Sequence, residues 1–170
     1  MNLENMHFPR QLEANGLAEK IREALAAHKI KLRPEGEMEV PVLGISPSLT
    51  NAIRKAGLQR RIRFGFDDIA EKLASEKKGI DHVSSQLHKQ QIDRISRLLL
   101  FSNDGAERLY RHIEQILTGH SGRILGCQLN IDGETMGRLL TGGSVGIKVI
   151  LVEHKDAVSD VLRALIKNGH

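Results

Sequence analysis

The side chains best suited to chemistry form a basic run in the first half of the chain, and that chemistry is phosphate binding. Five cations fall within ten residues that contain no acid: Arg54, Lys55, Arg60, Arg61 and Arg63. Each phosphate neutralised by such a cation releases condensed counterions, which drives salt-sensitive binding of nucleic acid. The alternative interpretation is a solvated helix end and strand edge without a ligand.

A glycine-rich loop is the second candidate. Residues 141–146 read Thr-Gly-Gly-Ser-Val-Gly, and backbone amides in such a loop can cradle phosphate. The loop has no Gly-Lys-Ser/Thr ending and precedes a strand rather than a helix, so it matches neither standard nucleotide-binding fingerprint. We expect Gly142, Gly143 and Ser144 to let an RNA backbone approach closely, with a flexible connector as the alternative.

Three polar residues follow predicted strands and raise the question of acid–base catalysis. Asp104 follows the strand at 98–101, and Glu153 and His154 follow the strand at 147–152. In a parallel sheet the carboxyl ends of these strands would meet, which would bring the three side chains together. A polar turn that caps the next helix explains them equally, and we expect no catalytic residues.

Metal and cofactor chemistry has little support in the sequence. Eight histidines are scattered along the chain without the paired spacing of a zinc helix. The lone cysteine, Cys127, excludes an internal disulfide and lies in an apolar run, which indicates a buried core thiol. We therefore expect no metal site and no cofactor.

The first half of the chain predicts helices and short extended segments. Apolar spacing indicates a helix within 12–28, and a turn at 33–36 separates two extended pieces between 29 and 42. Ser46 and Pro47 open a predicted helix over 47–56, because serine caps free amides and proline suits the first turn. A further helix is predicted over 67–76, and 81–94 is predicted as a polar helix or a linker.

The second half alternates strands and helices. Apolar runs predict strands at 98–101, 123–130 and 147–152, and helices are predicted at 106–117, 134–140 and 156–167. This order is typical of a mostly parallel sheet covered by helices. The predicted fold class is α/β, a three-layer sandwich in the C-terminal half preceded by a smaller α+β region. We divide the chain into 1–80, 81–94 and 95–170, and leave open whether 1–80 is separate or packs onto the later sheet.

Composition narrows the choice of partner and location. The net charge of +4 is compatible with an anionic partner but does not identify one. Aromatic residues make up only 3% of the chain, which argues against binding single-stranded nucleic acid by base stacking. No apolar run is long enough to cross a membrane, and the N-terminus lacks the features of a signal peptide. We expect a cytoplasmic protein.

The second half resembles the kink-turn RNA-binding ribosomal protein superfamily, which also supplies the last domain of archaeal and eukaryotic peptide release factors. The strand-to-helix turn at 98–107, the helix and loop at 134–143 and the final strand and helix at 149–165 follow that family's order. This resemblance covers about 75 residues, 95–168, and implies an RNA-binding α/β domain. A weaker resemblance links 46–63 to the tail of the bacterial YlxR family of nucleic-acid-binding proteins, whose cysteine-containing head is missing here.

The sequence departs from the kink-turn family at its main RNA-binding helix. That helix begins with glycine, an Asn-Glu pair and a lysine one turn on, whereas the comparable stretch here has Asp67 and Asp68 at the pair and Glu71 in place of the lysine. We predict a non-enzymatic RNA-binding or ribosome-associated protein acting in translation or RNA metabolism. The aspartates favour the alternative, a protein-interaction or regulatory module that binds no nucleic acid. The oligomeric state is open.

Overall fold

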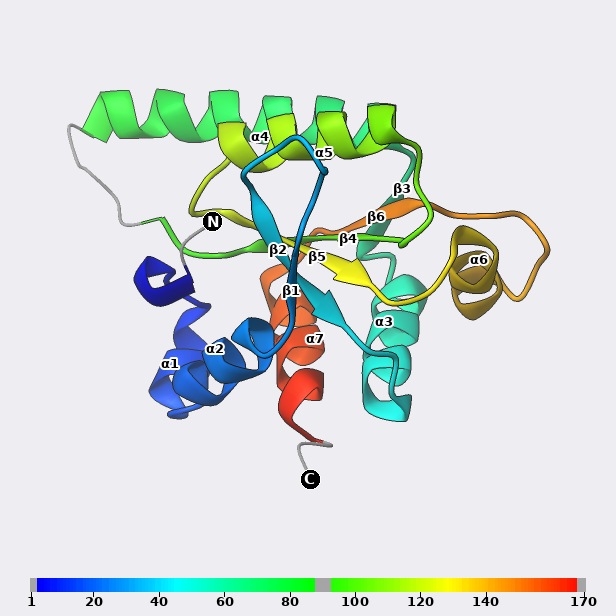
Figure 1. The fold of residues 1–170 in the computed structure, drawn as a ribbon. Coiled ribbons are helices and arrows are strands. Elements are labelled where there is room, and N and C mark those ends of the chain that lie inside the picture. The colour runs from blue at the N-terminus through cyan, green and yellow to red at the C-terminus, as the bar shows by residue number, and fades with distance from the viewer. Residues whose placement is uncertain (1–2, 88–92, 168–170) are drawn as a thin grey trace.

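A single mixed β-sheet organises the chain in the computed structural model, which describes residues 3–87 and 93–167 (Figure 1). The strands are β1 (Lys29–Lys31), β2 (Glu39–Leu43), β3 (Ile62–Phe64), β4 (Arg97–Phe101), β5 (Ile124–Leu129) and β6 (Val149–Val152). The helices are the 3₁₀ turn η1 (Leu3–Asn5) and the α-helices α1 (Arg10–Ala14), α2 (Ala18–Ala26), α3 (Pro47–Leu58), α4 (Phe66–Leu87), α5 (Glu107–Gly119), α6 (Gly133–Thr141) and α7 (Lys155–Lys167).

The sheet joins both halves of the chain in the strand order β1-β2-β5-β4-β6-β3. The three strands β2, β5 and β4 run parallel, while β1, β6 and β3 are each antiparallel to their neighbours. Strands from residues 1–80 therefore lie on both sides of the three strands from the C-terminal half. The predicted segment 81–94 belongs to α4 as far as Leu87, and its residues 88–92 lie outside the described part of the chain.

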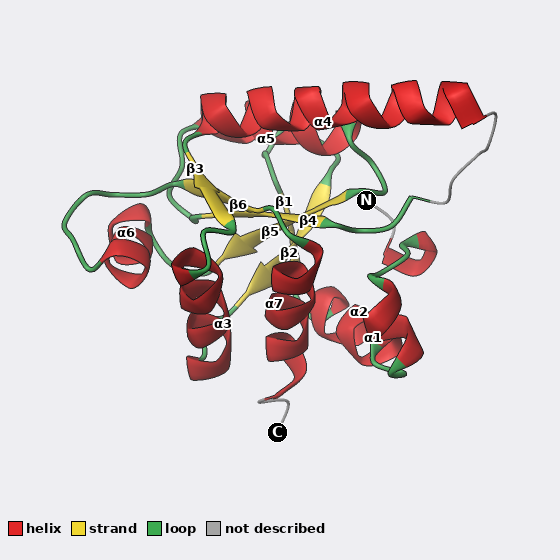
Figure 2. Ribbon diagram, turned by 180° about the vertical axis from the view of Figure 1, so that it is seen from behind, coloured by secondary structure: helices red, strands yellow, loops and turns green. Residues whose placement is uncertain are grey.

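Alternating side chains of the central strands bury both faces of the sheet. In β4, Leu98 and Leu100 enter one hydrophobic cluster, and Leu99 and Phe101 enter the other. Helices α4 and α5 cover one face, and α1, α2, α3 and α7 cover the opposite face, as Figures 1 and 2 show. The predicted fold class, an α/β sandwich, is confirmed.

Strand β6 runs opposite to the direction predicted for it. It pairs antiparallel with β4, so that Val149 lies opposite Phe101 and Val152 lies opposite Leu98. A parallel crossover needs a helix that runs back over the face of the sheet. Helix α6 instead lies beyond the end of the sheet (Figure 1), so the chain enters β6 at the end where β5 leaves it.

Two predictions made from single residues are confirmed, the Ser46 helix cap and the buried Cys127 thiol. The Ser46 hydroxyl accepts a hydrogen bond from the Leu49 amide at 3.1 Å, with Pro47 in the first turn of α3, as predicted. Cys127 is a buried core thiol, also as predicted. The helix predicted within 12–28 is divided into α1 and α2.

Candidate nucleic-acid interface

A groove between α3 and α6 brings Arg54 of the basic run to Gly142 of the glycine-rich loop, whereas Lys55, Arg60, Arg61, Arg63, Gly143 and Ser144 do not line it. Its volume is about 490 Å³, and its walls are the last turns of α3 and α6 with Phe64 at the end of β3. The Arg54 side chain of α3 donates from Nε to the Leu139 carbonyl oxygen of α6 at 3.0 Å. Residues 85 positions apart in the sequence therefore form one surface.

The five predicted cations separate into paired and unpaired side chains. Lys55 pairs with Asp160 at 3.3 Å, and Arg63 pairs with Glu153 at 3.0 Å. The hydrogen bond to Glu153 raises the pKa of Arg63, so this guanidinium stays charged. Within 3–87 and 93–167, the side chains of Arg60 and Arg61 have no hydrogen bond or ion pair, and Arg54 uses only Nε.

Strand alternation explains why Arg63 is separated from the groove. Successive side chains of a strand point to opposite faces of the sheet. Ile62 enters the cluster beneath α3, and Phe64, two residues on, lines the groove on that side. Arg63 points to the other face, toward the acids of α4 that help to raise its pKa.

The glycine-rich loop is exposed, but its first amides are already used within the chain. Gly142 ends α6 in the left-handed region at φ 73°, and its amide donates to the Arg138 carbonyl oxygen at 2.8 Å. The Gly143 amide donates to the Thr141 hydroxyl at 3.1 Å. Gly142, Gly143 and Ser144 thus offer an unobstructed surface for close approach rather than a cradle of free amides.

The structure does not assemble the hypothetical acid–base group. Because β4 and β6 are antiparallel, Asp104 and the pair Glu153 and His154 lie at opposite ends of the two strands. Asp104 contacts Lys148 at 2.8 Å and accepts a hydrogen bond from the Gly133 amide at 2.9 Å. The contact with Lys148 is the largest cause that lowers the pKa of Asp104, and Ser102 and the Gly133 amide add to it. Asp104 therefore links its own turn to the start of α6 and to the segment before β6. The arrangement considered for acid–base catalysis, with Asp104 beside Glu153 and His154, is not formed.

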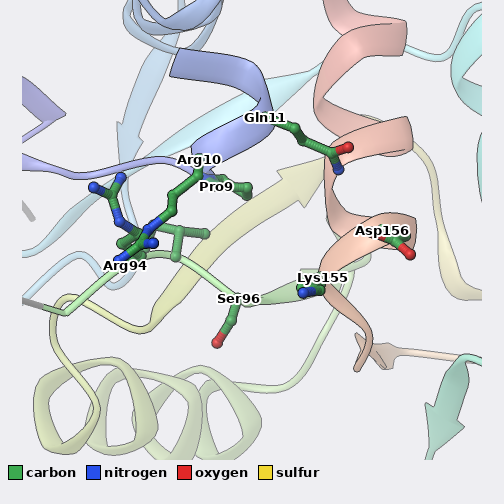
Figure 3. Close-up of a pocket in the computed structure, with 8 residues that line it drawn as sticks. Pro9, Arg10, Gln11, Arg94, Ser96, Lys155 and Asp156 are labelled. Atoms are coloured by element: carbon green, nitrogen blue, oxygen red, sulfur yellow. The ribbon is translucent and has the colours of Figure 1, made fainter. Parts of the chain in front are cut away.

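A second cavity, of about 480 Å³, lies between the start of α1, the segment before β4 and the start of α7 (Figure 3). Arg10 and Arg94 gather on one side of it, with Gln11 and Asp156 on the other. Arg94 is held by Glu13 at 2.8 Å and by the Phe8 carbonyl oxygen at 3.0 Å. The eight lining residues include no histidine or cysteine that could act as a base or a nucleophile beside Ser96.

The described residues contain neither a metal site nor a helix that could span a membrane. In 3–87 and 93–167, no three His, Cys, Asp or Glu side chains are grouped so that they could hold a metal ion. None of the helices in these ranges combines the length and the apolar character needed to cross a membrane.

Sequence reasoning missed two side chains of the groove. Leu58 and Phe64 are exposed at 86% and 43%, although both are large and apolar. The signal was their position at the helix end and strand edge that flank Arg60 and Arg61. Because β3 was not predicted as a strand, this signal had no structural context.

Comparisons with known proteins identify the fold but no family. No protein-family profile matches the chain, and neither does any curated protein, so the kink-turn resemblance stays a prediction. A protein of unknown function from Bacillus halodurans is similar in structure, with a TM-score of 0.50 and 11% identity over 72% of this chain and 100% of that one. The Giardia lamblia 15.5kD RNA binding protein aligns with a TM-score of 0.46 and 12% identity, over 70% of this chain and 82% of that one.

Proposed function

We propose that this protein binds RNA without catalysing a reaction, and that the rim of the α3–α6 groove contacts the phosphates. The observation that carries the proposal is that Arg54 lines the groove with Gly142 and keeps its two terminal nitrogens unbonded, while Arg60 and Arg61, in the segment between α3 and β3, have no side-chain partner among the described residues. Phosphate contacts of this kind position a protein on RNA without reading its sequence.

Pairing ranks the five cations by their expected contribution. Arg54 can keep its Nε bond to Leu139 when a phosphate arrives, and Arg60 and Arg61 have no side-chain partner to lose within the part of the chain that the structure describes. Lys55 and Arg63 would first have to leave Asp160 and Glu153. Arg63 and Glu153 are also partly buried, at 34% and 17% exposure, so separating them costs more than breaking a fully exposed pair. We therefore assign the larger contribution to the three unpaired arginines.

The finer part of the proposal concerns the role of the protein in the cell. The resemblance of 95–168 to ribosomal RNA-binding proteins supports ribosome association and a role in translation. The separation of Asp104 from Glu153 and His154 supports a protein that is not an enzyme.

The test is binding of the purified protein to total cellular RNA and to ribosomes, titrated with salt. Replacing Arg54, Arg60 and Arg61 together by alanine should reduce the slope of log K against log salt by roughly 2 to 3 units. The matched control replaces Arg10, Arg108 and Arg111, which are exposed and lie outside the groove. Both variants lose the same net charge, so equal slopes would remove the groove from the interface.

A protein-interaction module is the second candidate. The acids Asp67 and Asp68 in the first turn of α4, and the neutralised Lys55 and Arg63, favour it. Absence of RNA binding even at low salt would reject the RNA proposal. Co-purification of a specific protein that survives nuclease and high salt would then support the module.

A further inference from the structure

The second cavity, of about 480 Å³, is formed by three segments that are far apart in the sequence. Residues 9–11 at the start of α1, residues 94–96 before β4 and residues 155 and 156 at the start of α7 line it (Figure 3). Cavities that hold small organic ligands usually occupy about 300–1,000 Å³. No residue lines both this cavity and the α3–α6 groove. The cavity is therefore a separate place for a ligand, and its volume suits a small molecule.

Hydrogen bonds within the chain hold two of these segments together. The Ile95 amide donates to the His7 carbonyl oxygen at 2.8 Å. Nη1 of Arg94 donates to the Phe8 carbonyl oxygen at 3.0 Å and to the Glu13 carboxylate at 2.8 Å. The hydrogen bond from Arg94 lowers the pKa of Glu13, so this carboxylate keeps its charge and its hold on the arginine. The wall that carries Arg94 is thus in place before a ligand arrives, which reduces the entropy cost of binding.

Three cations of the lining keep donors for a ligand. Because both bonds of Arg94 use Nη1, its Nε and Nη2 have no hydrogen-bond partner within 3–87 and 93–167. Arg10 and Lys155 are exposed, and in the same ranges their side chains make no hydrogen bond or ion pair. Asp156 is the one acid among the eight lining residues. The lining therefore favours a negatively charged ligand.

We propose that this cavity binds a small organic phosphate, with the phosphate group held by Arg10 and Arg94. These two arginines gather on one side of the cavity (Figure 3). A phosphate has three acceptor oxygens and can bond both guanidinium groups at once, whereas a carboxylate has two. Pro9 and Ile95 give the lining an apolar part for the organic body, and Lys155 is a third donor on the α7 wall. This inference does not depend on RNA binding, because it uses none of the groove residues.

The experiment titrates the full chain with adenosine monophosphate and ribose 5-phosphate, and with adenosine and ribose as their phosphate-free counterparts. We expect calorimetry to detect binding of a phosphorylated compound and not of its counterpart, and the amide NMR signals of Ser96 and Lys155 to shift. Arg10→Ala removes a charged donor, so the affinity should fall roughly tenfold or more. Arg108→Ala is the matched control, since Arg108 is also exposed but does not line the cavity.

The possible outcomes separate this inference from the proposed function. Binding weakened in Arg10→Ala and kept in Arg108→Ala supports the cavity as a phosphate site, whether or not the protein binds RNA. If neither phosphorylated compound binds more tightly than its counterpart, or if both variants weaken binding equally, the site is overturned. If RNA shifts the same two amides and displaces the bound compound, the cations serve the RNA backbone, and the small-molecule assignment is overturned.

Discussion

Arginine side chains fall into two groups in this protein, those held by a carboxylate and those that remain unpaired. Arg33, Arg63, Arg94 and Arg97 each pair with a glutamate distant in sequence. Arg60 and Arg61 have no such partner among the described residues. Because a paired guanidinium is already satisfied, pairing selects which cations remain available to a ligand.

Glu76 is the one carboxylate in these pairs that contacts two arginines. It contacts Arg97 at 2.7 Å and Arg123 at 3.6 Å, and the three side chains are only 15% to 18% exposed. Glu76→Gln leaves two largely buried guanidinium groups without a counter-charge. We expect the free energy of unfolding to fall by about 2–4 kcal/mol. Urea unfolding measures it, and Glu134→Gln, in an exposed pair, should cost less than about 1 kcal/mol. Equal losses in the two variants would contradict this ranking.

The same carboxylate predicts a pH dependence of stability. Burial raises the pKa of Glu76, but Arg97 and then Arg123 outweigh this effect and bring it below its usual 4.5. A lowered pKa contributes stability that is present above pH 4.5 and is lost as the pH falls through the folded-state value. Wild-type unfolding free energy should therefore decline below about pH 4.5, and more steeply than that of Glu76→Gln. Parallel pH profiles for the two proteins would exclude Glu76 as a source of acid sensitivity.

Helix α6 and the loop that follows it are fitted to each other at Gly137. A Cβ atom at this position would overlap the Val145 carbonyl oxygen, so only glycine lets the loop fold back on the helix. This contact fixes the course of the loop that begins with Gly142 and Gly143, of which Gly142 lines the groove. The conformation of the loop after α6 therefore depends on the absence of a side chain at residue 137.

Gly137→Ala should displace the loop and lower the free energy of unfolding by about 1–3 kcal/mol. Amide NMR shifts of Gly142 and Gly143 report the displacement, and urea unfolding reports the stability. Gly79→Ala is the matched control, because Gly79 is exposed in α4 with no atom near a new Cβ. That change should raise stability by about 0.5–1 kcal/mol. Unchanged Gly142 and Gly143 shifts in Gly137→Ala would show that the contact does not position the loop.

At the scale of the whole molecule, the sheet order makes the two halves of the chain interdependent. β2 pairs with β5, and β3 pairs with β6, so strands from residues 1–80 complete both sides of the central sheet. Helices α2 and α3 contribute Ile21, Leu25, Leu49 and Ile53 to the core cluster on one face. Removing them would expose this cluster to water.

The predicted division at 81–94 can be tested directly with the fragment 95–170. Because β5 and β6 would lose β2 and β3, and one face would lose α2 and α3, we expect the fragment to lack a cooperative thermal transition. Circular dichroism during heating, with the full chain as control, provides the measurement. A cooperative transition in the fragment would establish 95–170 as an independent domain.

Local patterns in the sequence determined the elements and the fold class. The continuous apolar run at 98–101 predicted a strand buried on both faces, the largely apolar segment 147–152 predicted another strand, and Ser46 with Pro47 predicted a helix start. These predictions succeeded because an apolar run and a helix cap are each formed by residues adjacent in the sequence. The acid-free run between Arg54 and Arg63 likewise identified one wall of the groove without any coordinates.

Only the tertiary structure decided the direction of β6, the pairing of Arg63 and the exposure of Phe64. Glu153 lies 90 positions from Arg63, and Asp160 lies 105 positions from Lys55, so no local pattern connects them. The position of α6 beyond the end of the sheet reversed β6 and separated Asp104 from Glu153. Phe64 is 43% exposed and ends an edge strand, and strand order arises from packing between distant segments rather than from the periodicity of any one of them.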